Sequence, residues 1–164
     1  HDEGWALDVV GACSPANRHY LTELIALAGD SPIAFRPDAP FGELRRLYSR
    51  ARLYWHAQGY GEDAQAHPET QEHFGITTVE AMSAGCIPVV INTAGPREVV
   101  APVDGAGRWS TLEGLASVTR HLASLPSGDL DAVAESCRVR SGEFTPEAFA
   151  ARVRQLLIGI GEPA

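Results

Sequence analysis

Two glutamates, Glu72 and Glu80, flank the start of a predicted helix over residues 75–84. Apolar residues recur there at helical spacing, and glycines stand at both ends. Gly75 allows the chain to turn tightly and to approach a ligand closely. The first amides of the helix are then free donors, and the helix dipole favours an anion in front of them.

The carboxylates on either side of this anion site point to a second kind of contact. Like charges repel, so Glu72 and Glu80 are poorly suited to gripping phosphate. An ionised carboxylate is a strong acceptor and can take two hydroxyl groups at once. Phosphate between two sets of hydroxyls describes a sugar nucleotide, with ribose on one side and a donor sugar on the other. The spacing alone fits an acidic, capped surface helix equally well.

Short apolar runs alternate with amphipathic stretches along the 164 residues, and this alternation defines the expected fold. The expected strands are 5–11, 32–35, 52–55, 87–91 and 107–109, and the expected helices are 17–28, 41–50, 75–84, 95–100, 112–125, 130–139 and 146–158. This order predicts an α/β domain with a doubly wound, mostly parallel sheet, in which the run 5–11 is a buried strand. Ligands of such sheets bind beyond the carboxyl ends of the strands, in this chain after Gly11, Phe35, Trp55 and Ile91.

Residues 59–71 differ from the rest because they are polar and lack any periodicity. Long loops of this kind in compact domains are usually functional or mobile. We therefore expect a poorly anchored loop that faces the cleft.

Composition excludes several classes of partner. The net charge is −8 and the chain has no lysine, so neither a nucleic acid nor a polybasic contact with anionic lipid is expected. No apolar run is long enough to span a bilayer. Cys13, Cys86 and Cys137 lie far apart without a C-x-x-C pair, which predicts reduced thiols and no zinc site.

The stretch 72–90 resembles the signature of a known enzyme family. It reads Glu-x7-Glu followed by Ala-Met-x-Ala-Gly-x-x-Pro-Val-Val, and it resembles the signature of the retaining glycosyltransferases of family 4, which have the GT-B fold. Further segments, at 5–11, 44–51, 93–98 and 141–149, resemble other family motifs in the same order. The resemblance thus covers nearly the whole chain and implies that 1–164 is a Rossmann-like C-terminal half of GT-B. The form Glu-His-Phe-Gly is also similar to eukaryotic mannosyltransferases that build dolichol-linked oligosaccharide.

The resemblance implies a role for each matching residue. Glu80 would bind the ribose hydroxyls, and Glu72 would hold a hydroxyl of the donor sugar in a catalytic position. The residues whose amides would face the sugar and the diphosphate are Phe74, Gly75, Ile76 and Thr77. Phe35 and Arg36 would lie near the base, and Gly95 belongs to the glycine-containing loop of the donor site. His56 would line the reaction cleft; the alternative is a histidine satisfied by a backbone group.

The chain also departs from the family. The family's domain begins with a strand ending Gly-Arg and a helix bearing lysine, whose cations neutralise the leaving diphosphate. Nothing in the sequence matches them, so we expect the first strand and helix, and an acceptor-binding N-terminal domain, to be absent, and this chain alone to be inactive. Strands 5–11 and 52–55 would then pair directly or contact another chain.

The implied activity is transfer of a hexose from a GDP- or UDP-linked donor to an acceptor hydroxyl with retention. No metal or other cofactor is expected. The acceptor, a glycan, a lipid-linked glycan or a small molecule, would bind to the missing domain, and that domain would also provide any peripheral contact between this cytoplasmic protein and the inner membrane. Two alternatives remain: a nucleotide-sugar epimerase of related fold, and a non-catalytic nucleotide-sugar-binding module.

Overall fold

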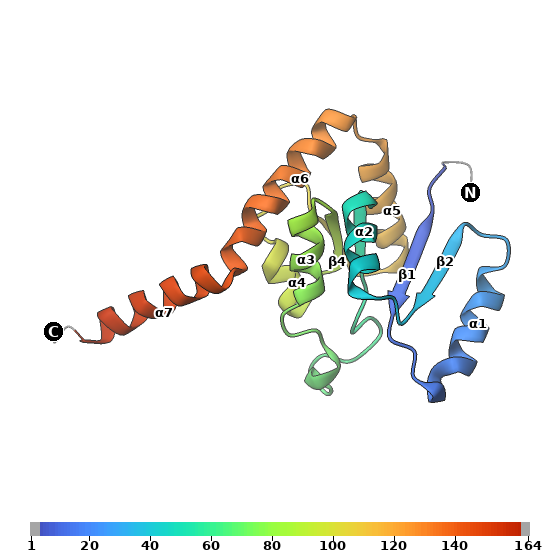
Figure 1. Ribbon diagram of the computed structural model, residues 1–164, viewed down its shortest axis with the longest axis horizontal. Helices are drawn as coiled ribbons and strands as arrows, with labels where there is room; N and C mark the ends of the chain where they lie inside the picture. Colours follow the sequence, from blue (N-terminus) through green and yellow to red (C-terminus); the bar gives the residue numbers. More distant parts are fainter. Residues whose placement is uncertain (1–3, 162–164) are drawn as a thin grey trace. The chain divides into compact units, whose positions relative to one another are not determined.

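The computed structural model describes residues 4–161 and divides the chain into two compact units. The first unit ends at Arg50 and the second begins at Ala51. Figure 1 shows both units and labels most of their helices and strands. Each unit is an α/β arrangement of its own, so each is described by itself.

The first unit is a βαβ module followed by one helix. Its elements are β1 (Leu7–Gly11), the 3₁₀ turn η1 (Pro15–Asn17), α1 (Arg18–Ala28), β2 (Ile33–Pro37) and α2 (Phe41–Arg50). Strands β1 and β2 are parallel, with Leu7 opposite Ile33 and Gly11 opposite Pro37. Helix α1 ends where Gly29 takes a positive φ of 53°, which lets the chain turn back into β2.

No described residue of the first unit is buried. The expectation that 5–11 forms a buried strand was therefore wrong about burial, since the Val9 side chain in β1 is 37% exposed. The physical reason is the size of the sheet. Two strands and their crossover helix cannot enclose an apolar side chain from all sides.

The second unit contains a three-stranded parallel sheet in the order β3-β4-β5. Its elements are β3 (Leu53–His56), η2 (Pro68–Thr70), α3 (Ile76–Ala84), β4 (Ile87–Ile91), α4 (Ala94–Val100), β5 (Gly107–Trp109), α5 (Leu112–Ser124), α6 (Ser127–Ser141), η3 (Gly142–Phe144) and α7 (Pro146–Gly161). Figure 1 shows α7 extending away from the other helices of this unit.

Strand β4 is the centre of the second unit, and all five of its residues are buried. Side chains alternate between the two faces of a strand, and β4 follows this rule. Val90 packs with residues of α3, α4 and α6, including Met82, Val100 and Cys137. Ile87, Val89 and Ile91 pack into a second cluster with residues of α5, α6 and β5. Helices therefore cover both faces of the sheet, as in other α/β domains.

The predicted fold class, α/β with parallel strands and crossover helices, is confirmed. The ranges 41–50, 87–91 and 107–109 agree with α2, β4 and β5 to the residue, whereas the helix expected at 130–139 runs over 127–141. The direct pairing expected between 5–11 and 52–55 would join the two units and stays a prediction. Among the described residues, β1 pairs with β2 and β3 pairs with β4. No helix in this part of the chain is both long and apolar enough to cross a membrane.

Candidate functional site

The N-terminus of α3 is built around a left-handed glycine. Gly75 is the residue before the helix, with φ 85° and ψ 54°, a conformation that other residues adopt only with strain. The first helical bond runs from the amide of Thr78 to the Gly75 carbonyl at 2.9 Å. The amides of Ile76 and Thr77 precede this ladder, and no side chain caps the helix at Gly75. The predicted donors are thus present in part: the amides of Ile76 and Thr77 lie ahead of the helical ladder, whereas those of Phe74 and Gly75 bond to the Glu72 carboxylate.

Glu72 lies directly before this helix and is held by the backbone. Its Oε1 accepts a hydrogen bond from the Phe74 amide at 3.1 Å. This bond lowers the pKa of Glu72, and the Gly75 amide and the nearby His56 and His73 act in the same direction, against partial desolvation. Glu72 is consequently ionised at neutral pH and presents a fixed acceptor beside the helix terminus.

Glu80 lies in the second turn of α3 and is partly buried. A tyrosine that the sequence did not single out lies within electrostatic reach of both carboxylates: Tyr54 in β3 donates its hydroxyl proton to Thr77 Oγ1 at 2.8 Å. Burial raises the pKa of Tyr54, and the charges of Glu72 and Glu80 raise it further. Both carboxylates are therefore close enough to act on one hydroxyl group, and the structure brings Glu72, Glu80 and Thr77 together. Its position in an expected strand gave no indication of this contact, which joins residues 23 positions apart.

His56 ends β3 and is buried, with 6% of its surface exposed. Burial lowers its pKa, while the negative charge of Glu72 partly opposes this shift. The imidazole is therefore neutral at pH 7. Its Nδ1 atom has no hydrogen-bond partner within the described part of the chain, so a backbone group does not satisfy that nitrogen. His56 is thus a buried neutral imidazole within electrostatic reach of Glu72.

Gly95 belongs to the first turn of α4, and it supports the loop that carries Glu72. Its amide donates to the Glu72 carbonyl at 3.1 Å. A Cβ atom at this position would overlap the carbonyl oxygen of His73 and lie 2.6 Å from Phe74 Cα. Only glycine permits this approach of α4 to residues 72–74. The structure therefore brings Gly95 to the same loop as the predicted sugar-binding residues.

Phe35 and Arg36 belong to β2 in the first unit. They line a hollow of about 240 Å³ at the carboxyl ends of β1 and β2, together with Gly11 and Cys13. The Arg36 guanidinium contacts the carboxylates of Asp8 and, at 3.2 Å, Glu43. The two residues predicted to lie near the base thus flank a hollow where ligands of parallel sheets bind.

Residues 59–71 are well anchored, which corrects the expectation of a poorly held loop. The Asp63 carboxylate accepts hydrogen bonds from the amides of Gln65 and Ala66 at 2.9 and 3.1 Å. Gln71 is buried, and the Tyr60 ring lies 5.2 Å from that of Trp109. Turns centred on an acidic side chain organise a chain without any hydrophobic periodicity, which is why the periodicity did not reveal this order.

The remaining side chains with metal-binding or redox chemistry include three cysteines, of which Cys86 and Cys137 are buried within electrostatic reach of each other. In residues 4–161 the structure shows no group of three or more His, Cys, Asp or Glu side chains arranged to hold a metal ion. Burial raises the pKa of Cys86 and of Cys137 to about 11, so both thiols stay protonated, as expected for buried cysteines. Cys13 is partly exposed.

Comparison with known proteins agrees with this fold. A solved structure described as WaaG, a glycosyltransferase involved in lipopolysaccharide biosynthesis, matches 96% of this chain and 38% of its own chain. The TM-score is 0.60 at 22% sequence identity, which supports a common GT-B fold.

Curated proteins are also similar to this chain in amino-acid sequence. A GDP-Man:Man(3)GlcNAc(2)-PP-Dol alpha-1,2-mannosyltransferase of Yarrowia lipolytica is 35% identical over 120 residues, 68% of this chain and 17% of the relative. The proteins of the same name from Xenopus laevis and Homo sapiens are 26% and 27% identical over 88% and 71% of this chain. The chain spans between 17% and 29% of the length of these three relatives.

The family model described as "Glycosyl transferases group 1" matches residues 2–111. This range holds both β1–β2 and the Glu72–Glu80 site. It covers most of the chain, and the chain therefore belongs to the group 1 glycosyl transferases.

Proposed function

We propose that this chain is the donor-binding domain of a family 4, retaining glycosyltransferase, and that it binds a nucleotide diphosphate sugar at the N-terminus of α3. The observation that carries the proposal is the pair Glu72 and Glu80 on either side of a helix terminus with free amides. Anions bind at such termini, and carboxylates accept hydroxyl groups. The site therefore has amide donors for the diphosphate and carboxylate acceptors for the hydroxyl groups of the ligand.

In this arrangement the amides of Ile76 and Thr77 face the diphosphate, and Glu80 accepts the ribose hydroxyls. Glu72 accepts a hydroxyl of the donor sugar. The Phe74 amide donates to Glu72 Oε1, so its part is to orient this carboxylate. The helix terminus also stabilises the charge that develops on the leaving diphosphate, which provides for transfer without a metal ion.

The donor that best agrees with the comparisons is GDP-mannose, because the curated relatives are named as GDP-Man-dependent mannosyltransferases. Their names also describe a dolichol-linked glycan as acceptor. We propose a mannosyl donor and a lipid-linked glycan acceptor for the complete enzyme, with the acceptor bound by a domain outside these 164 residues.

The test of nucleotide binding is calorimetry with GDP on the full-length protein and its Glu80→Ala variant. A charge-assisted hydrogen bond contributes about 1.5–3 kcal/mol, so the affinity for GDP should fall roughly tenfold or more. Glu147→Gln is the matched control, because Glu147 is an exposed carboxylate in the first turn of α7. Unchanged GDP affinity in Glu80→Ala would contradict the assignment of the ribose site.

The test of the donor-sugar role is Glu72→Gln. We expect mannosyl transfer by the full-length enzyme to fall much more than GDP affinity, because the proposed contact is with the sugar. Equal losses in both would count against this role. Tight GDP-mannose binding without any transfer, in a full-length protein supplied with acceptor, would instead support a non-catalytic binding module.

A further inference from the structure

The loop that carries Glu72 has an aromatic contact with a distant part of the chain. We call residues 72–75 the donor loop. The Phe74 ring meets the Phe144 ring edge to face, with centroids 5.5 Å apart and planes inclined by 67°. Phe144 ends η3 and packs against the hydrophobic cluster of α3, β4 and α4. Phe74 is 43% exposed, so its ring has one side in solvent and one against an anchored partner.

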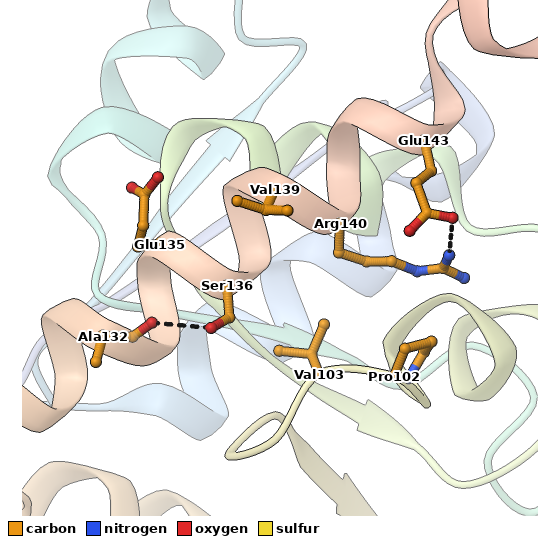
Figure 2. A pocket seen from close by; sticks show the side chains of 8 residues that line it. All are labelled: Pro102, Val103, Ala132, Glu135, Ser136, Val139, Arg140 and Glu143. Atoms are coloured by element: carbon orange, nitrogen blue, oxygen red, sulfur yellow. Dashed lines mark hydrogen bonds and ion pairs between the residues drawn. The ribbon is translucent and has the colours of Figure 1, made fainter.

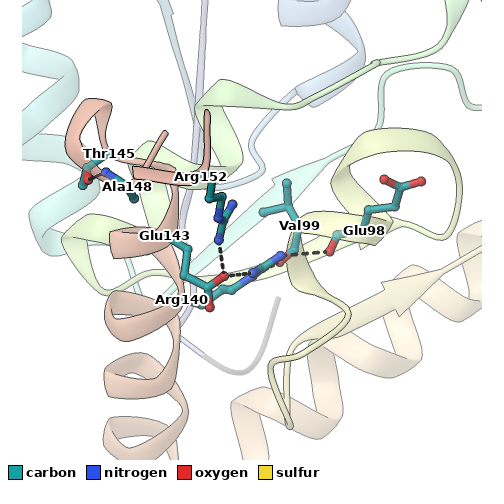
Figure 3. A network of polar contacts seen from close by, with 7 residues as sticks. All are labelled: Glu98, Val99, Arg140, Glu143, Thr145, Ala148 and Arg152. Atoms are coloured by element: carbon teal, nitrogen blue, oxygen red, sulfur yellow. Dashed lines mark hydrogen bonds and ion pairs between the residues drawn. The ribbon is translucent and has the colours of Figure 1, made fainter. Parts of the chain in front are cut away.

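Phe144 is itself held by Arg140 of α6. The Arg140 guanidinium carbon lies 4.6 Å from the centre of the Phe144 ring, within the range of a cation–π contact. The same guanidinium donates to the carbonyl oxygens of Val99 at 3.0 Å and Glu98 at 3.4 Å. These carbonyls belong to the last turn of α4, where a cation is favourable. Figure 3 shows Arg140 reaching from its own helix to these two carbonyls.

Helix α4 is a second connection between Arg140 and the donor loop, besides the Phe144 ring. Its first turn donates the Gly95 amide to the Glu72 carbonyl, and its last turn is bound by Arg140. The donor loop therefore rests on two supports, the Phe144 ring and the start of α4. Arg140 contacts the first support, the Phe144 ring, and the opposite end of α4 from the second.

Arg140 adds polar bonds to the contact between α6 and α4, in which Cys137 of α6 shares a buried cluster with Val99 and Val100 of α4. A hollow of about 520 Å³ lies between α6 and the residues that follow α4, with Val103 on one side and Val139 on the other. Figure 2 shows Arg140 and Glu143 at one end of this hollow. Glu143 accepts from Arg140 at 2.6 Å and from Arg152 of α7 at 2.8 Å. These side-chain bonds therefore act beside the apolar cluster that joins the helices.

We propose that Phe144, held by Arg140, is a positioning residue for the donor loop: it fixes Phe74 so that the Phe74 amide stays on the Glu72 carboxylate. The two aromatic rings restrict the backbone at residue 74, and the amide of that residue orients Glu72 Oε1. Phe144 does not touch the donor. The inference rests on the proposed function in one respect only: that function identifies the ligand that binds to Glu72.

The first test needs no ligand. The Glu72 carboxyl is followed by ¹³C NMR as a function of pH in the full-length protein, and Glu72→Gln identifies its signal. Because the Phe74 amide holds the pKa of Glu72 below its ordinary value, Phe144→Ala should move the Glu72 midpoint upward. Phe149→Ala is the matched control: it also removes a phenylalanine near the start of α7, but its side chain is 68% exposed.

A merely structural role for Phe144 would lower the melting temperature and leave the Glu72 midpoint unchanged, and that result would overturn the proposal. Phe74→Ala should raise the midpoint as Phe144→Ala does, and the double variant should add nothing further. Independent, additive shifts would also overturn it. If Phe144→Ala does not fold, Phe144→Leu retains apolar bulk while removing the ring and decides the same question.

The second test uses GDP and GDP-mannose. Phe144→Ala should lower the affinity for GDP-mannose roughly three- to tenfold, as expected for losing one aromatic pair, while GDP affinity changes little. If the wild-type protein binds GDP-mannose and Phe144→Ala binds it with the same affinity, the positioning role is overturned. If the wild-type protein binds neither compound, the proposed function fails, and the Glu72 titration still decides the inference.

Discussion

Strands β1 and β4 have similar sequences and opposite environments. They read Leu-Asp-Val-Val-Gly and Ile-Pro-Val-Val-Ile, and each is a five-residue parallel strand. Val9, the third residue of β1, is 37% exposed, whereas Val89, the third residue of β4, is fully buried. Strand β4 has a neighbour on each side and helices on both faces, while β1 has one neighbour among the described strands. An apolar run therefore predicts a strand, but burial depends on how many elements surround it.

The two units also differ in the contacts that organise them. In the first unit, the partly exposed Arg36 joins the carboxylates of Asp8 and Glu43. The second unit has ion pairs as well, such as Arg140–Glu143, but all the buried residues among those described belong to it, and at Gly95 no side-chain atom fits. The first unit should accordingly respond to salt, and the second to small changes of volume.

The largest expected effect is that of a single methyl group at Gly95. Gly95→Ala places a Cβ against the His73 carbonyl and Phe74 Cα, both backbone groups that cannot move aside easily. We expect a loss of about 3 kcal/mol in the free energy of unfolding of the second unit, at the upper end of overpacking costs. Urea denaturation measures it. Gly11→Ala in β1 is the matched control, because a Cβ there meets nothing within 4 Å. Equal effects at the two glycines would contradict the contrast.

The comparison of β1 and β4 can be tested with one substitution in each. Val89→Ala should destabilise the second unit by about 2 kcal/mol, through lost apolar burial and a residual cavity. Val9→Ala should cost no more than about 0.5 kcal/mol, as is usual for exposed positions. Hydrogen exchange resolved by peptide separates the two units. A loss of protection in β1 as large as that in β4 would show that β1 is buried in solution.

Element positions were readable from the sequence where local signals agree. Strand β4 is bounded by Gly85 before it and by a short polar segment after it, and its predicted range was correct. Gly75 correctly marked the start of α3 as well. Local conformational preferences and hydrophobic periodicity are sufficient for such boundaries.

Contacts between distant residues were not readable in this way. The Phe74–Phe144 pair and the bond from Tyr54 to Thr77 join residues 70 and 23 positions apart, so no spacing rule indicates them. The anchoring of 59–71 was missed for another reason. Asp63 could have been recognised as a local turn former, but periodicity does not register a turn.

A smaller effect is expected from pH. His56 is buried and neutral, and its pKa is lower in the folded than in the unfolded chain. Below about pH 6.5 the unfolded chain binds a proton that folded His56 does not, so the second unit should lose stability as the pH falls from about 7 to about 5. Melting curves across this range measure the slope. His56→Gln should flatten it, whereas His19→Gln, at an exposed histidine of the first unit, should not. An unchanged slope in His56→Gln would show that other groups cause it.

The smallest expected effect is at Arg36. Asp8 raises the pKa of Arg36 more than any other group does, and the side chains of both residues are 39% exposed. Exposed ion pairs contribute little and are screened by salt, so Arg36→Gln should reduce hydrogen-exchange protection in β1 and β2 only slightly at low ionic strength. At about 1 M salt the Debye length is only about 3 Å, and most of the difference from the wild type should disappear. Arg45→Gln, on the exposed face of α2, should have no effect at either ionic strength. A loss of protection in Arg36→Gln that persists at high salt would mean that the guanidinium acts through packing, and the contrast between an ion-paired first unit and a packed second unit would then have to be abandoned.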